Sequence, residues 1–342
     1  MTSTVIVDAM GGDNAPVVPV FSSLEVCTEN SGIKILLVGS ESIIKNLLSD
    51  VKIPENLEIV DAVDSITMDD PPASAFRNKE NSSIHIGMNL LTEGKGDAFF
   101  SAGNTGAIVT AAYFKSGVIP NITRPALATS YPSVDKHKLI ILDLGATIDP
   151  KAENLFDFGV LGEAYRFFMT GLETSRISIL NVGTEENKGN RKLVAAAEMM
   201  KESTLNYKGF IESNILFSHP ETDVVVTDAF TGNVALKTVE GLTETISQLI
   251  KAKIAPSQLP KIQTFLFNKI FGEVFRMFQY NLYGTAFLLG VNHFIGIGHG
   301  RSDKKAFKNA ILRLKRYSER NFTKKIADRV QAVKKSIGTT DS

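Results

Sequence analysis

The chain has 342 residues, of which 43% are hydrophobic and 22% are charged, which is typical of a soluble globular protein with a large core. It contains no run of about 18 apolar residues and no basic leader before its first strand, so we expect a cytoplasmic protein without a membrane span or a signal peptide. A single cysteine, Cys27, excludes an intrachain disulfide, and the scattered histidines predict no metal site, so we interpret Cys27 as a buried apolar residue rather than a nucleophile.

Strands and helices alternate from the start of the chain. Apolar runs predict strands at Thr4–Met10, Lys34–Gly39 and Leu57–Ala62, each followed by a helical segment. The first strand ends at Gly11 and Gly12, which Asp8 and Asp13 bracket, so two carboxylates lie at the carboxyl end of a strand. This alternation predicts an α/β protein with a mostly parallel sheet between two layers of helices, a three-layer sandwich.

The segment Asp97–Gly117 carries the strongest local signal. A short strand at Ala98–Phe100 stops at a turn of small residues, and a helix begins at Asn104 or Thr105, which are both good N-caps. Unpaired N–H groups and the positive end of a helix dipole favour an anion at such a turn. We predict that a small anion binds at Ser101, Gly103, Asn104, Thr105 and Gly106. The alternative is a plain strand-to-helix turn with a good cap.

Several later strands end in similar polar turns. Further strands are predicted at Ala126–Tyr131, Lys138–Leu144, Arg176–Val182, Asp223–Thr227 and Phe294–Ile297. The turns that follow four of them are Asp143–Ala146, Gly183–Asn190, Asp228–Asn233 and Gly298–Gly300. Because the carboxyl ends of parallel strands share one edge, we expect these turns to converge. The GxGxxG, GxxxxGK[ST] and GxSxG patterns are missing, which counts against NAD, ATP and serine-hydrolase chemistry and predicts no cofactor.

The last third of the chain holds one apolar and one basic segment. Pro256–Tyr283 carries apolar residues over more than half of a helix circumference, which favours burial against a neighbour or a dimer partner, or contact with a lipid chain or membrane. From Arg301 to Lys335 there are 13 Lys and Arg against three Asp and Glu, a local balance of +10. Such a segment suits an acidic partner or an anionic membrane surface, or is a solvated helix face. Its few aromatics argue against nucleic acid.

Together these segments resemble the bacterial phosphate acyltransferases of phospholipid synthesis, the acyl-[acyl-carrier protein]:phosphate acyltransferases. The matching motifs are VDAMGGDNAP (Val7–Pro16), SAGNTGA (Ser101–Ala107), RPALAT (Arg124–Thr129), LDLGA (Leu142–Ala146), NVGTEENKGN (Asn181–Asn190), TDAFTGNVALKTVEG (Thr227–Gly241) and GHGRSD (Gly298–Asp303). The resemblance implies a fold related to phosphotransacetylases and to isocitrate/isopropylmalate dehydrogenases. It implies one catalytic domain over residues 1–342, with an apolar helical hairpin at about 250–284 and a basic helical C-terminus at 301–336. It also implies a cytoplasmic homodimer, which in some members contacts the membrane peripherally.

The resemblance also implies the reaction. Inorganic phosphate attacks the thioester of an acyl-carrier protein and gives acyl phosphate, without a cofactor and without a protein nucleophile. The candidate catalytic residues are Asn104 and Asn233 for the oxyanion, Lys188 or Lys237 for negative charge, Asp8, Asp143 or Asp228 for the phosphate proton, and His299 for the departing thiolate. A structural role for His299 in its turn is the alternative. The predicted docking surface for the acidic carrier is Lys304, Lys308 and Arg316.

Two other hypotheses stay open at this point. The first is a transferase that uses a coenzyme A thioester in place of the carrier protein. The second is a non-catalytic phosphate- or lipid-binding module that docks through Ile262–Phe278 and the basic segment. A dehydrogenase is disfavoured because the sequence has neither an acidic metal-binding cluster nor a dinucleotide motif.

Overall fold

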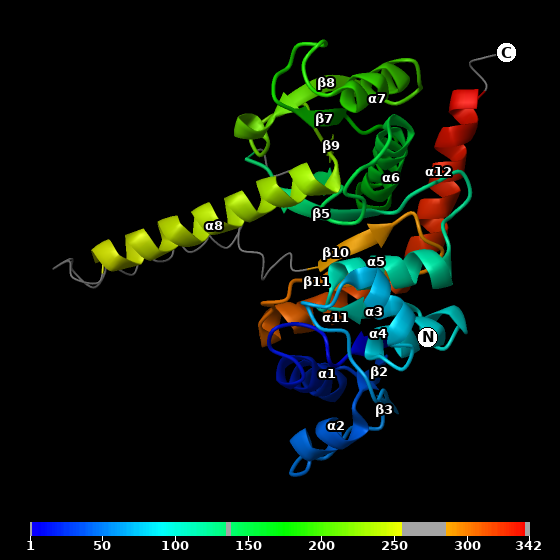
Figure 1. Ribbon diagram of the computed structural model, residues 1–342, viewed down its shortest axis with the longest axis vertical. Helices are drawn as coiled ribbons and strands as arrows, with labels where there is room; N and C mark the ends of the chain where they lie inside the picture. Colours follow the sequence, from blue (N-terminus) through cyan, green and yellow to red (C-terminus); the bar gives the residue numbers. More distant parts are fainter. Residues whose placement is uncertain (1, 135–137, 255–284, 339–342) are drawn as a thin grey trace.

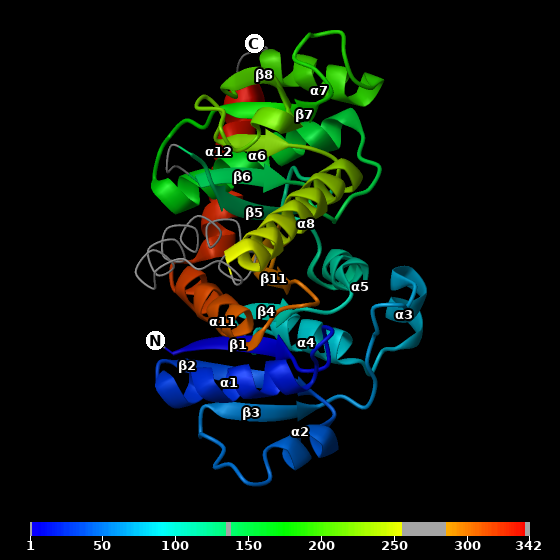
Figure 2. The same cartoon turned by 90° about the vertical axis from the view of Figure 1, so that its left-hand side faces the viewer.

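The computed structural model describes residues 2–134, 138–254 and 285–338. Within these ranges an 11-stranded sheet forms the centre of the molecule, and its strands follow one another along the long axis in the order β3-β2-β1-β4-β11-β10-β5-β6-β9-β7-β8 (Figures 1 and 2). The strands are β1 (Ser3–Asp8), β2 (Ile33–Gly39), β3 (Leu57–Asp61), β4 (Ala98–Ser101), β5 (Ala126–Pro132), β6 (Lys138–Leu142), β7 (Ile177–Asn181), β8 (Tyr207–Glu212), β9 (Val224–Val226), β10 (Thr285–Leu289) and β11 (Ile295–Gly298).

The sheet consists of two parallel halves that run in opposite directions. Strands β3, β2, β1, β4 and β11 form the first half, and β6, β9, β7 and β8 form the second. Between them, β10 pairs antiparallel with β11 and with β5, and β5 pairs antiparallel with β6. The predicted α/β fold with a mostly parallel sheet is confirmed. The expectation that all the polar turns share one edge is wrong, because the antiparallel pairings reverse the strand direction.

Helices cover both faces of this sheet. On the first half, α1 (Val17–Glu29) and α11 (Lys304–Ser318) pack together on one face, and α4 (Ser83–Thr92) and α5 (Thr105–Ala111) cover the other. The alternation along β1 matches this arrangement, since Val5 and Val7 lie in one core and Ile6 lies in the other. The remaining helices include α2 (Glu41–Leu47), α3 (Pro72–Asn78), α6 (Ala152–Thr170), α7 (Arg191–Lys201) and α12 (Phe322–Gly338), with a π-helical turn at Ala112–Ser116 and a 3₁₀ turn at Ser213–Ile215.

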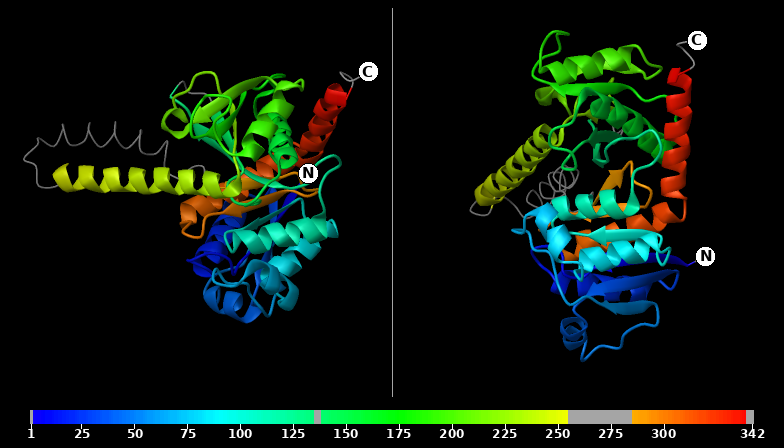
Figure 3. Two further views of the ribbon diagram at one scale, coloured as in Figure 1. Left: turned by 45° about the horizontal axis from the view of Figure 1, so that its top comes forward. Right: turned by 45° about the vertical axis from the view of Figure 1, so that its right-hand side comes forward.

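The long helix α8 (Ala229–Ile254) leaves the second half directly after β9 and projects from the body of the molecule (Figures 1 and 3). The sequence predicted a polar turn at Asp228–Asn233 and a helix from Val234 onward. The helix begins earlier because the Asp228 carboxylate caps it, accepting hydrogen bonds from the Thr231 N–H at 2.8 Å and the Thr231 hydroxyl at 2.7 Å. Asn233 therefore lies on the helix rather than in a loop.

The sequence analysis did not predict two of the strands, β8 and β10. The register of β8 against β7 shifts between Ile177 and Ile179, and Gly209 has a φ of 101°, so the alternating pattern of an edge strand is broken. β10 follows the apolar segment directly. The predicted hairpin at about 250–284 falls mainly on residues 255–284, outside the described residues, and the basic segment forms α11 and α12. Among the described helices, none is both long enough and apolar enough to span a bilayer.

Candidate active site

The strand order reverses between β1 and β4, and the turns after these two strands are in contact. In the sheet, β2 lies beside β1 and β3 lies beside β2, whereas β4, the next strand along the chain, lies on the other side of β1. In α/β sheets ligands bind at such a reversal. At this point the Ser101 hydroxyl donates to Asp8 Oδ2 at 2.6 Å and accepts the Gly103 N–H at 3.0 Å. One buried hydroxyl therefore joins the two turns.

Asp8 lies beneath this junction rather than at its surface. Asp8 is 1% exposed, and its other carboxylate oxygen, Oδ1, accepts the Met10 N–H at 2.9 Å. Burial raises the pKa of Asp8, while the hydrogen bond from Ser101 lowers it in part. A Cβ atom at Gly11 would lie 2.8 Å from both Gly103 N and Ser101 Oγ, so glycine is required there. Asp8 therefore supports the turn in this structure, and its catalytic role stays a prediction.

Asn104 also has a structural role here. Its Oδ1 caps α5 by accepting the Ala107 N–H at 3.0 Å. Its Nδ2 donates to the carbonyl oxygens of Thr67 at 3.1 Å and Asp70 at 2.9 Å. Because a carboxamide has two N–H donors, these bonds leave no donor for a substrate. In this structure Asn104 caps α5 and holds the 67–70 segment against it, and its oxyanion role stays a prediction.

The accessible part of this corner is Thr105 and Gly106. Both are partly exposed, whereas residues 101–104 are buried. Within the described ranges, the backbone N–H groups of Thr105 and Gly106 make no hydrogen bond, as expected for the first turn of a helix. The five residues predicted for anion binding therefore divide into two groups: Ser101, Gly103 and Asn104 form the floor, and Thr105 and Gly106 present the donors.

The turn after β6, in the other half of the sheet, reaches this corner. A Cβ atom at Gly145 would lie 3.7 Å from Thr105 Cγ2 and 3.9 Å from Asn233 Nδ2, so these three residues surround one position. Asp143 shapes the turn, since its carboxylate accepts N–H groups at 2.6 to 3.0 Å from Leu127, Gly145, Ala146 and Thr147. Burial raises the pKa of Asp143 to about 6, although these N–H groups oppose the shift. Asp143 is therefore a structural carboxylate.

Helix α8 adds two charged residues on the face that carries Asn233. Lys237 and Glu240 follow Asn233 by four and seven residues, so the three side chains lie along one side of the helix. Glu240 Oε2 lies 3.9 Å from His299 Nε2, with the two side chains 23% and 27% exposed. Burial raises the pKa of Glu240, and Lys237 and Arg301 partly oppose this shift. The sequence analysis did not identify Glu240 as a site residue. The available signal was its spacing of three residues from Lys237, which puts both side chains on one face of a helix.

His299 belongs to the same site because its turn packs on the β1 and β4 turns. The Asp13 N–H donates to the Gly300 carbonyl at 2.8 Å. A Cβ atom at Gly12 would lie 3.2 Å from that carbonyl oxygen and 3.3 Å from Ala102 Cβ. The β11 turn, the β1 turn and the β4 turn therefore form one contiguous surface beside α8.

Lys188 is not brought to this surface. Its ammonium pairs with Glu185 at 2.7 Å in the exposed turn after β7, and this pairing raises the pKa of Lys188. Among the described contacts none joins Lys188 to Thr105, Asn233 or His299. Of the two lysines that the sequence left open, Lys237 is the one that the structure places beside His299 and Glu240.

Six of the 13 basic residues in the C-terminal segment pair with acidic residues of the described chain. Lys304 contacts Glu25 at 2.5 Å, and Lys308 contacts Glu25 at 2.8 Å and Glu29 at 2.6 Å. The hydrogen bonds from both lysines lower the pKa of Glu25 to about 2. Arg316 is exposed and has no acidic partner among the described residues. Of the three predicted docking residues, Arg316 is therefore the one whose charge is not paired with an acidic residue of the described chain.

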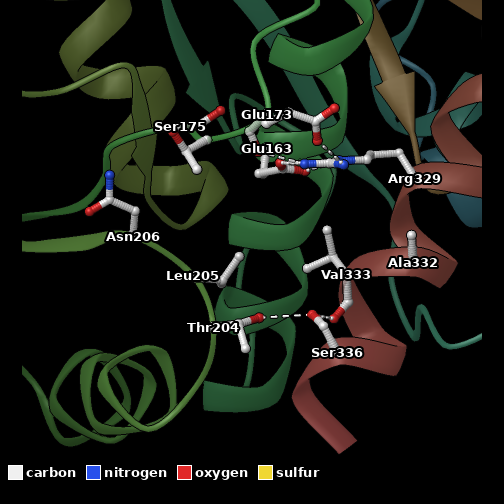
Figure 4. Close-up of a pocket in the computed structure, with 11 residues that line it drawn as sticks. Glu163, Glu173, Ser175, Thr204, Leu205, Asn206, Arg329, Ala332, Val333 and Ser336 are labelled. Carbon is white, nitrogen blue, oxygen red and sulfur yellow. Dashed lines mark hydrogen bonds and ion pairs between the residues drawn. The ribbon is translucent and has the colours of Figure 1, made fainter. Parts of the chain in front are cut away.

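A pocket of about 290 Å³ lies elsewhere, between α6, α12 and the segment before β8 (Figure 4). Its polar groups bind one another: Arg329 pairs with Glu163 at 2.6 Å and with Glu173 at 2.9 Å, and the hydroxyls of Thr204 and Ser336 lie 2.9 Å apart. The residues that line it include none of the predicted site residues of the described chain. We therefore place the candidate active site at the Thr105 corner.

Comparison with solved structures defines the class of fold. A phosphotransacetylase from Streptococcus pyogenes matches with a TM-score of 0.59 at 15% identity, covering 93% of this chain and 94% of that one. A 4-hydroxythreonine-4-phosphate dehydrogenase from Klebsiella pneumoniae matches with a TM-score of 0.51 at 15% identity, covering 93% and 98%. At these identities the likeness shows the fold alone, which is the α/β fold shared by phosphotransacetylases and these dehydrogenases. The predicted relationship to phosphotransacetylases is confirmed, and the one to isocitrate/isopropylmalate dehydrogenases stays a prediction.

Sequence comparison then gives the family. The model of the fatty acid synthesis protein family matches residues 3–325. Proteins named phosphate acyltransferase from Desulfitobacterium hafniense (strain DSM 10664 / DCB-2) and Brevibacillus brevis are 39% and 37% identical, covering 94% and 98% of this chain and 96% and 99% of theirs. The chain therefore belongs to the fatty acid synthesis protein family, and the resemblance to phosphate acyltransferases found in the motifs is confirmed.

Replacing Asn104 tests its assignment as a structural residue. We expect Asn104→Ala to lower the free energy of unfolding by about 2–4 kcal/mol, since it removes an N-cap worth ~1 kcal/mol and two hydrogen bonds to the 67–70 segment worth ~0.5–1.5 kcal/mol each. Asn190→Ala is the matched control, because Asn190 caps α7 from an exposed position and should cost only about 1 kcal/mol. Urea unfolding measures both. Equal stability losses in the two variants would contradict the assignment.

Proposed function

We propose that this chain transfers an acyl group from an acyl-carrier protein to inorganic phosphate, and so supplies acyl phosphate to phospholipid synthesis. The proposal is supported by the family to which the chain belongs and by the names of its relatives. The observation that carries it is the contact of the Gly145 turn with Thr105 and Asn233, which brings the unbonded N–H groups at the start of α5 close to the helix that carries Lys237 one turn beyond Asn233. A tetrahedral oxyanion suits such a site better than a large planar cofactor does.

In this proposal, phosphate binds to the N–H groups of Thr105 and Gly106, and Lys237 offsets its charge. A phosphate oxygen attacks the thioester carbonyl, forming the new C–O bond, and the C–S bond then breaks. The proton of the phosphate hydroxyl ends on the leaving sulfur, so the products are acyl phosphate and the carrier thiol. Asn233, whose Nδ2 lies beside the Gly145 turn, is the proposed side-chain donor to the oxyanion.

No protein nucleophile is needed for this reaction. Cys27 is 3% exposed, and burial raises its pKa to about 12, so it is not a thiolate at neutral pH. The predicted interpretation of Cys27 as a buried apolar residue is confirmed. Direct attack by phosphate is therefore the route that the proposal adopts.

The identity of the acyl donor is tested by supplying both thioesters. Acyl-carrier protein and acyl-coenzyme A of the same chain length are each mixed with the chain and inorganic phosphate, and acyl phosphate is measured. We expect product from the carrier thioester. Product from the coenzyme A thioester alone would favour a phosphotransacetylase-like enzyme, and phosphate binding without consumption of either thioester would favour a binding module.

Lys237 and Lys188 form a matched pair for testing the phosphate site. We expect Lys237→Ala to lower kcat/KM for phosphate by about 10²-fold, because it removes a preorganised positive group beside two reacting anions. The kcat/KM of Lys188→Ala for phosphate should stay close to that of the parent chain, since Lys188 pairs with Glu185 in an exposed turn. Initial rates at varied phosphate measure both effects. The reverse order of the two losses would place the phosphate near the β7 turn.

We also propose that the exposed face of α11 docks the acidic carrier protein, chiefly through Arg316. Lys304 and Lys308 contribute less, because Glu25 and Glu29 already neutralise them. Charges at the rim of an interface change the rate at which the partners associate rather than the rate of the chemical step.

Charge reversal at Arg316 tests this surface. We expect Arg316→Glu to raise KM for acyl-carrier protein several-fold at low salt and to leave kcat nearly unchanged, with the difference shrinking as salt screens the interaction. Lys324→Glu is a control at a lysine that pairs locally with Asp328 on α12. A KM for the carrier that is unchanged by Arg316→Glu would exclude this docking face.

The predicted homodimer and the peripheral membrane contact belong to the same proposal. The homodimer follows from the resemblance to the family, and the membrane contact from the apolar segment Pro256–Tyr283, which lies outside the described ranges. They stay predictions of the sequence.

A further inference from the structure

We infer that the loop of residues 65–81 is a lid on the proposed phosphate site, and that Pro72 on this lid favours phosphate over water as the nucleophile. The inference rests on the proposed function, because it adds a specificity-determining residue to acyl transfer. It concerns a choice that the N–H donors of the site do not make by themselves, since both nucleophiles attack the same thioester carbonyl.

The two ends of this loop are joined. Asp64 and Ser82 form a parallel bridge, in which the Asp64 N–H donates to the Asn81 carbonyl at 3.3 Å and the Ser83 N–H donates to the Asp64 carbonyl at 3.2 Å. The loop leaves the sheet after β3, carries α3, and returns at the start of α4. A compact loop with joined ends can move as one unit, and such loops frequently serve function.

The loop packs directly on the start of α5. A Cβ atom at Gly106 would lie 2.6 Å from Pro72 Cγ and 2.9 Å from Pro72 Cβ, so the proline ring rests on the Gly106 backbone. The Cα–Cβ direction in a helix tilts toward the N-terminus, so the ring lies on the side of Gly106 that faces the helix start. Helices α3 and α5 lie beside each other (Figure 1). Pro72 therefore closes one side of the place where the proposed N–H donors are offered.

The loop is attached to this corner by polar contacts more than by apolar burial. Asn104 Nδ2 donates to the carbonyl oxygens of Thr67 at 3.1 Å and Asp70 at 2.9 Å. The buried apolar residues of the loop are Ile66 and Ala75. A segment that buries so little apolar surface opens at a lower free energy than the sheet does. The lid can therefore open while the rest of the fold stays intact.

A second set of contacts holds the lid at the far end of α3. The Phe76 ring lies 4.3 Å from the His85 ring and 5.8 Å from the Phe114 ring, measured between centroids. The Phe76 carbonyl oxygen accepts a hydrogen bond from His85 Nε2 at 2.6 Å. These contacts lie on α4 and on the π-helical turn that continues α5, so they fix the lid in its closed position against both elements.

Exclusion of water is what such a lid contributes to the reaction. If water attacks the thioester carbonyl, a C–O bond forms and the C–S bond breaks, one water proton ends on the sulfur, and the products are the free carboxylic acid and the carrier thiol. Closing a site keeps water from the thioester and from reactive products such as an acyl phosphate. The Pro72 ring is apolar and has no N–H, so it fills its side of the site without binding water.

The first measurement reports the lid and does not depend on turnover. Amide hydrogen exchange of the full chain is followed with and without saturating inorganic phosphate. We expect phosphate to slow exchange several-fold in residues 65–81 and to leave residues 183–189, in the exposed turn after β7, unchanged. Unchanged exchange of the loop while calorimetry shows bound phosphate would overturn the inference, as would equal slowing of both segments.

The second measurement compares two neighbouring prolines. Pro72→Gly and Pro71→Gly both remove an exposed ring at the start of α3 and add similar backbone freedom. Pro72 supplies the two atoms nearest to a Cβ at Gly106, whereas Pro71 supplies none of the three nearest. We expect Pro72→Gly to raise the initial ratio of free acid to acyl phosphate several-fold, and Pro71→Gly to keep the ratio of the parent chain. Chromatography of a labelled acyl chain measures the ratio.

Three results separate the possible failures. The same product ratio in the parent and in both variants would overturn the inference, because the lid would then not exclude water. An equal rise in both variants would overturn the role of Pro72, since loop flexibility alone would explain it. A parent chain whose loop is protected by phosphate but which forms acyl phosphate from neither thioester would overturn the proposed function and, with it, the choice of nucleophile assigned to Pro72.

Discussion

The site depends on the hydrogen bond by which the buried Ser101 hydroxyl donates to Asp8 Oδ2 while it accepts the Gly103 N–H. This bond joins the ends of β1 and β4 at the point where the strand order reverses. It fixes the direction in which α5 begins, and so it sets where the N–H groups of Thr105 and Gly106 point. The close approach of the two turns leaves room only for hydrogen at Gly11.

A second constraint is the reversal of the sheet between its halves. Strands β6 and β9 run opposite to β1 and β4. Strand direction alone therefore does not bring the polar turns after β6 and β9 to the turns after β1 and β4. The Asp143 turn and α8 make the connection. The first turn of α8 packs so closely on the Asp143 turn that a side chain at Gly232 would collide with the Asp143 carbonyl oxygen. The helix then carries Lys237 and Glu240 to the turn that holds His299.

The sequence predicted the local structure of this region better than its assembly. The strand at Ala98–Phe100, the cap at Asn104 and the small-residue turns follow from patterns only a few residues long. The direction of β10 and β5 depends on pairing between distant segments, which no local pattern encodes. The choice between Lys188 and Lys237 depends on the path of α8. The structural role of Asn104 could not be predicted from the local pattern, because its partners, Thr67 and Asp70, lie more than thirty residues away.

The central claim is that the corner built on Asp8 and Ser101 holds the phosphate. A crystal structure of the chain grown with inorganic phosphate tests it most directly. The account predicts phosphate oxygens at about 3 Å from the N–H groups of Thr105 and Gly106, with the Lys237 ammonium on the open side. Phosphate bound instead at the turn that holds Lys188, or a Thr105 corner without phosphate at saturating concentration, would contradict the account.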